Sequence, residues 1–235
     1  MNWALQRLRL LFEVVHSPEV AFSRELTGPS CLVPLCVFGL LSAVISAIQF
    51  PLQAEWMRFQ LESADASAVQ AAASLELVRR SGALSVALAP TLLFLRWLLL
   101  ASIIWLVAGL FALVLDYSKT LTIVAYSYLP MVVRDAVILL VLLLRGDQAL
   151  YQPEGLNVAI GANLLLPWLQ LPWSALAANI NIFEVWLVSL LVIGISRAAK
   201  CRCTRALAIV LPTWGIAVLA QLAFVVLGLA VKRSL

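Results

Sequence analysis

The sequence predicts an all-α polytopic membrane protein with five transmembrane helices, an N-terminal amphipathic helix and short extramembrane helices. Of its 235 residues, 63% are hydrophobic and 12% are charged, whereas soluble domains are about 45–50% apolar and about 25% charged. The apolar residues form runs as long as the roughly 20 residues that cross a bilayer core. These runs lack the apolar/polar alternation of membrane β-strands, so their backbone groups must be hydrogen-bonded within helices.

The first part of the chain, residues 1–30, is expected to lie in the cytosol or at the membrane interface. Polar residues recur at steps of four and three from Asn2 to His16, which predicts a helix with one polar face. Its other face carries Leu8 and Phe12, so the helix suits the plane of the membrane interface. A soluble helix docked on the spans is the alternative. Pro18 is expected to stop this helix, because proline disfavours helical backbone in the residue before it.

One membrane domain is expected at residues 31–231, followed by a tail at 232–235. The first apolar run begins too late in the chain for a cleaved signal peptide and is interpreted as a retained span. Pro90 interrupts the second apolar run, which predicts a bend there or a strongly tilted span. The five expected spans are residues 31–50, 97–115, 121–144, 182–196 and 206–231.

Local signals set the expected ends of these spans. The first is expected to end before Pro51, and a short turn at 116–119 is expected to join the second and third. Asn181 and Glu184 have the spacing of a helix cap and the third helical residue, which predicts the start of the fourth span. The loop at 145–181 contains an apolar stretch that is expected to lie at the interface or to re-enter the membrane.

The positions of Lys and Arg predict the orientation. With five spans, eight of them fall on the side of the N-terminus and six on the other, apart from two inside spans. The segment 197–205 is short, carries four cations and has no acid. We therefore expect a cytoplasmic N-terminus and an external C-terminus.

Three ionisable residues inside the expected spans need an explanation, because charge is costly in lipid. They are Arg96 in the second apolar run, and Arg134 and Asp135 in the third. A hairpin around 116–119 would place Asp135 about one helical turn from Arg96, so we predict an ion pair between them. A structural ion pair that fixes the hairpin is favoured over a proton or ion relay.

Residues typical of enzymes are missing from the sequence. His16 is the single histidine, which excludes multi-histidine metal sites, and no phosphate-binding or dinucleotide loop is present. No basic stripe with interleaved aromatic residues indicates nucleic-acid binding. We expect no catalytic, cofactor-binding or metal-binding residues, no cofactor, and no nucleic-acid partner.

Several segments resemble one family, the Yip family of integral membrane proteins named for interaction with Ypt/Rab GTPases. They are Ser17–Phe22 before the first span, Ala125–Pro130 in the third and Asn181–Trp186 at the start of the fourth. The last of these continues into Leu191–Ile195, and a basic loop then leads to Ala206 and Trp214-Gly215 in the fifth span. The resemblance implies five spans with a cytosolic N-terminus. The charged residues in the spans do not match the family pattern. The residues matching the family motifs are Tyr126, Pro130, Asn181, Phe183, Trp186 and Gly194.

The segment before the first span is shorter than in eukaryotic members and resembles the prokaryotic branch. Binding of Rab GTPases is therefore not carried over, and the expected location is a bacterial inner membrane.

Two functions are consistent with these features. The favoured one is a non-enzymatic scaffold or accessory subunit that acts in the lipid bilayer through membrane-protein partners or as a homo-oligomer. Small residues spaced by four, Ala108 with Ala112 and Gly194 with Ala198, offer contact surfaces either for partners or within the bundle. The alternative is a small transporter or channel that uses Arg96, Arg134 and Asp135.

Overall fold

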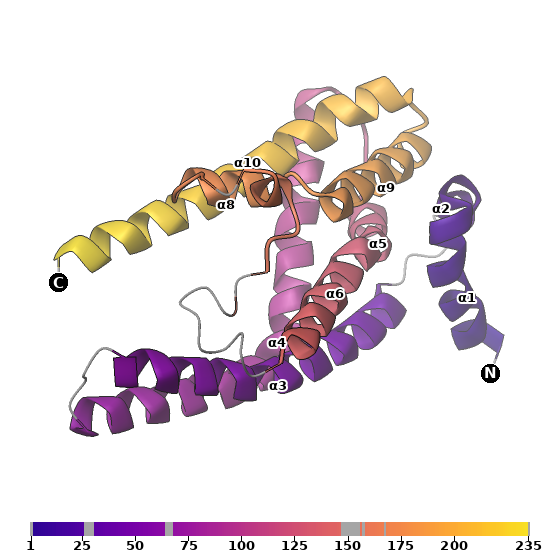
Figure 1. Ribbon diagram of the computed structural model, residues 1–235. Coiled ribbons are helices and arrows are strands. Elements are labelled where there is room, and N and C mark those ends of the chain that lie inside the picture. The colour runs from indigo at the N-terminus through magenta and orange to yellow at the C-terminus, as the bar shows by residue number, and fades with distance from the viewer. Residues whose placement is uncertain are drawn as a thin grey trace. The chain divides into compact units, whose positions relative to one another are not determined.

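Long apolar helices dominate the computed structural model of the protein (Figure 1). The structure describes residues 2–25, 31–63, 68–146, 156, 158–166 and 168–234. Within these residues, four helical stretches are long and apolar enough to cross a membrane, and this protein is an integral membrane protein. They are Leu32–Ser63, Ala72–Leu110, Tyr117–Arg145 and Cys203–Gly228.

The chain divides into two compact units. One unit is made of Met1–Pro34, Leu95–Met131 and Ala159–Leu235, and the other of Leu35–Phe94 and Val132–Val158.

The first unit begins with two short helices, α1 (Asn2–His16) and α2 (Pro18–Glu25). The predicted helical period from Asn2 to His16 is confirmed, and so is its end before Pro18. The sequence interpretation missed α2, which starts at the proline itself. Proline is well suited to a first helical position, because the N–H group that it lacks would have no intrahelical partner there.

The second unit contains a helical hairpin made by most of α3 (Leu32–Ser63) and the first part of α4 (Ala68–Leu110). A Cβ added at Gly82 would lie 1.8 Å from the ring of Phe50, so this ring lies directly on the Gly82 backbone. The expectation that the first helix ends before Pro51 is wrong, because α3 continues through it. Pro51 removes one backbone hydrogen bond, and the contact of Phe50 with α4 holds the helix on the N-terminal side of this defect.

The predicted turn at 116–119 is also wrong. Asp116 is the N-cap of α5 (Tyr117–Ser127), and its carboxylate accepts a hydrogen bond from the Lys119 N–H at 3.0 Å. The chain reverses earlier, after α4 ends at Leu110, and Ala112 there has a φ of 52°. Aspartate favours caps because its side chain replaces a missing helical acceptor.

The expected third span consists of two helices. α5 ends at Ser127, and Tyr128 alone separates it from α6 (Leu129–Arg145). Pro130 has no N–H to donate to the carbonyl four residues earlier, so the helix restarts there. The two helices together still form one stretch that is long enough to span the membrane.

The rest of the first unit is built around α9 (Ile182–Ala198), which packs against α2, α5 and α10 (Cys203–Ser234) (Figure 1). A 3₁₀ turn, η1 (Ala162–Leu164), and α8 (Trp173–Ala178) pack against each other before it, and α8 also contacts α10.

Candidate functional site

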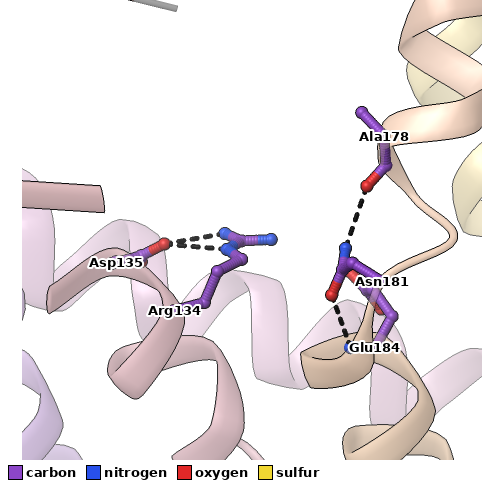
Figure 2. A network of polar contacts seen from close by, with 5 residues as sticks. All are labelled: Arg134, Asp135, Ala178, Asn181 and Glu184. Atoms are coloured by element: carbon purple, nitrogen blue, oxygen red, sulfur yellow. Dashed lines mark hydrogen bonds and ion pairs between the residues drawn. The ribbon is translucent and has the colours of Figure 1, made fainter. Parts of the chain in front are cut away.

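Asn181 caps α9, as its spacing from Glu184 predicts (Figure 2). Its Oδ1 accepts a hydrogen bond from the Glu184 N–H at 2.9 Å, and its Nδ2 donates to the Ala178 carbonyl at 2.9 Å. One buried amide therefore ties the start of α9 to the end of α8. The last carbonyl groups of α8 and the first N–H groups of α9 have no partner within their own helices, so such contacts satisfy them.

The carboxylate of Glu184 is a feature that the sequence interpretation did not identify as part of a site. Glu184 is buried and lies in the first turn of α9. It accepts a hydrogen bond from the indole N–H of Trp214 on α10 at 3.2 Å. The positive end of the helix dipole favours an acid at this position. Only the position of Glu184 in the first turn was readable from the sequence, because Trp214 lies 30 residues away.

Gly161 and Ala162, at the start of η1, are held against the end of α8 and the residues that follow it by backbone contacts. The Ala162 N–H donates to the Ile180 carbonyl at 2.9 Å. A Cβ added at Gly161 would lie 2.6 Å from the Ala178 carbonyl oxygen. Glycine is therefore required at position 161, because any other residue would push this segment away from α8.

The charged pair of α6 lies in the second unit (Figure 2). The Arg134 guanidinium donates from Nε and Nη2 to one oxygen of Asp135, at 3.0 and 2.8 Å. Residues next to each other on a helix normally point apart, so the long arginine side chain curls toward its neighbour. The pair cancels two opposite charges within an apolar helix.

Arg96 belongs to the first unit and lies over an aromatic ring. Its guanidinium carbon is 5.5 Å from the centre of the Tyr128 ring, and the neighbouring Trp97 meets that ring edge-on at 5.8 Å. A cation over an aromatic face is attracted by the ring's electrons. Arg96 and Asp135 fall in different units, and the ion pair between them stays a prediction.

A comparison with known protein families matches residues 12–225 to the Yip1 domain. The chain belongs to the Yip family. No curated protein and no solved structure matches the chain.

Four of the family-motif residues of this Yip-family chain lie where a helix breaks or begins. Tyr126 and Pro130 are buried next to the break between α5 and α6, and Phe183 and Trp186 are half-buried on the first turns of α9. Their roles in the function stay predictions. Their positions indicate that the motif marks the two places where the apolar helices of the first unit start or break.

One member of each small-residue pair of the Yip-family chain packs within the protein. A Cβ on Gly194 would lie 2.4 Å from Cγ2 of Ile123, so Gly194 allows α9 to approach α5 closely. Ala108 is fully buried, and Ala112 lies beyond the end of α4 in a left-handed conformation. Neither pair offers a continuous small-residue face to a partner.

The described residues of this Yip-family protein contain no group of three or more His, Cys, Asp or Glu side chains placed to hold a metal ion. The arrangement can neutralise charge and join helices. It brings Asn181 together with Glu184, and Arg134 together with Asp135.

Proposed function

We propose that this Yip-family protein is a non-enzymatic scaffold or accessory subunit that acts by binding other membrane proteins. The observation that carries the proposal is the small fraction of the apolar helices that the chain itself covers. In the most apolar window of α3, 17% of the residues are buried. In a membrane, such a helix surface contacts lipid or another membrane protein.

Three charged residues of the apolar helices support the same proposal, because they are engaged in contacts within the chain. Arg134 and Asp135 neutralise each other, and Glu184 joins α9 to α10 through Trp214. A charged residue such as Glu184, which joins two helices, has a structural role, so its presence does not require a transported ion. No described contact favours the transporter alternative.

The proposal includes a fifth span, α9. Its 17 residues measure about 25 Å, close to the lower limit of about 17 residues for a transmembrane helix. Five spans would place the two ends of the chain on opposite sides. Lys200 and Arg202, in the turn between α9 and α10, favour the cytoplasm for that turn and for the N-terminus. Location in a bacterial inner membrane stays a prediction.

Photo-cross-linking in intact membranes tests the proposed function. A photoreactive amino acid replaces Leu40, which is largely exposed on α3, and adducts are identified by mass spectrometry. The matched position is Leu219 on α10, which is exposed to a similar extent. We expect one protein, or a second copy of this chain, to be captured in stoichiometric yield from at least one position.

Lipid adducts alone at both positions would contradict the proposal. Ion flux through vesicles that is abolished by Asp135→Asn in a correctly folded protein would support transport in its place.

A further inference from the structure

α1 has three distinct faces. Leu10, Leu11 and Val14 are buried against the rest of the first unit. A second face is apolar and uncovered, with Phe12 72% exposed and Leu8 and Val15 more than one third exposed. The third face is polar, and its described residues are Arg9, Glu13 and His16.

These faces are spaced around the helix by roughly a third of a turn each, at about 3.6 residues per turn. A helix that lies beside a membrane protein in the plane of the interface has three surroundings, which are protein, acyl chains and water. A soluble helix docked on the spans needs one apolar face, and α1 has a second.

The neighbouring contacts place α1 near the C-terminal end of α9, which is the fifth span of the proposed function. α2 packs on α9, and Glu19 at its start forms an ion pair with Arg197, the second-last residue of α9. Ser17 alone separates α1 from α2. The C-terminal end of α1 is therefore held near the level at which α9 leaves the apolar region.

Positive charge gathers at the same end of the unit. Lys200 and Arg202 are exposed in the turn that follows α9, where Lys200 adopts a left-handed φ of 50°. Cations beside an apolar surface are attracted to anionic lipid headgroups. The charge and the uncovered apolar face thus complement the same partner, an anionic leaflet.

We propose that α1 is an interfacial anchor that inserts Leu8, Phe12 and Val15 into the anionic leaflet beside the turn between α9 and α10. The anchor is independent of any protein partner of the spans. Because the basic turn lies beside α1, the depth to which α1 inserts depends on the charge of the lipid headgroups.

Site-directed spin labelling of the full chain in nanodiscs tests the anchor. The four native cysteines are replaced by serine, and single cysteines replace Phe12 or, as the matched control on the polar face, Arg9. Accessibility to oxygen and to a water-soluble nickel complex reports the depth of each label. We expect the Phe12→Cys label roughly 5–10 Å into the headgroup and acyl boundary, and the Arg9→Cys label in water.

Equal nickel accessibility at the two positions would overturn the proposal, because both faces would then be in water. Low accessibility to both reagents at position 12 would also overturn it, since a protein surface would then cover that face. Both labelled proteins are compared by size-exclusion profile, so that misfolding is recognised.

The lipid charge is tested with the same label in nanodiscs of phosphatidylglycerol or phosphatidylcholine. We expect the Phe12→Cys label to lie deeper in phosphatidylglycerol, and this difference to vanish in the Lys200→Gln/Arg202→Gln variant. Equal depth in the two lipids would overturn the anionic part of the proposal.

Discussion

The side chain of Asn181 joins two helices. Its Oδ1 accepts a hydrogen bond from the N–H of Glu184 on α9, and its Nδ2 donates one to the carbonyl of Ala178 on α8. Asn181→Ala removes both bonds and is expected to destabilise the protein by at least the roughly 0.5–2 kcal/mol of a lost cap. Asn181→Asp keeps an acceptor for the cap and loses the donor to Ala178. We expect thermal unfolding in detergent to rank the native protein above Asn181→Asp, and Asn181→Asp above Asn181→Ala. Equal stability of the two variants would show that the cap itself contributes little.

The ion pair of Arg134 and Asp135 gives a second prediction at this scale. Asp135→Ala leaves a guanidinium without its counter-charge in an apolar helix, where a charge costs about 2.5–3.5 kcal/mol near the bilayer centre. We expect the yield of folded protein to fall, and the double variant Arg134→Leu/Asp135→Leu to recover it, because a pair replaced by apolar residues is often neutral.

The same series tests the predicted pairing of Arg96 with Asp135. If that pair dominates, Arg96→Leu/Asp135→Leu recovers the yield and the Arg134 double variant does not. A fully stable Asp135→Ala protein would contradict both pairings. Yields are compared by fluorescence-detected size-exclusion chromatography in the same detergent.

Between helices, the close approach of α5 and α9 depends on Gly194. Ile123 is β-branched and therefore stiff in a helix, so it cannot move away from a new side chain. Gly194→Val is expected to destabilise the protein by about 1–3 kcal/mol through overpacking, as measured by thermal unfolding. Ile123→Ala in the same chain should restore part of this loss.

Gly215 on α10 provides the matched control, because a Cβ there would meet nothing within 4 Å. Gly215→Ala should be neutral or stabilise the helix by up to about 1 kcal/mol. A loss of stability in Gly215→Ala equal to that in Gly194→Val would show that glycine flexibility, and not the contact with Ile123, sets the result.

Local rules predicted some elements well and failed at others for a physical reason. The extent of α1 and the cap at Asn181 follow from residues within one or two helical turns, so the sequence alone was sufficient. Pro51 and Pro130 carry the same local signal, yet α3 continues through one and the helix breaks before the other. Contacts with distant residues, such as Phe50 on Gly82, lie outside the reach of a local rule.

The candidate site was predicted in part for the same reason. Its individual residues could be found from their charge and position, and the Asn181–Glu184 cap from their spacing, but partners distant in the sequence could not. The structure pairs Asp135 with the adjacent Arg134, while the partner on another helix that the hairpin register predicted, Arg96, stays a prediction. The partner of Glu184 on α10 required the fold of the first unit.

At the scale of the whole molecule, the account depends on whether α9 crosses the bilayer. Four described stretches meet the length and composition of a span, and α9 is shorter. α9 packs against α2, α5 and α10, and its crossing of the bilayer stays a proposal. The membrane side of α1, of the basic turn and of both chain ends follows from this single helix.

The most direct measurement is the sidedness of the two chain ends. Single cysteines are placed at each end of a cysteine-free protein, and cells are labelled with a membrane-impermeant thiol reagent before and after permeabilisation. The account predicts that the C-terminal cysteine reacts in intact cells and that the N-terminal cysteine reacts only after permeabilisation. Labelling of both ends from the same side would contradict five spans and remove α9 from the membrane-crossing helices.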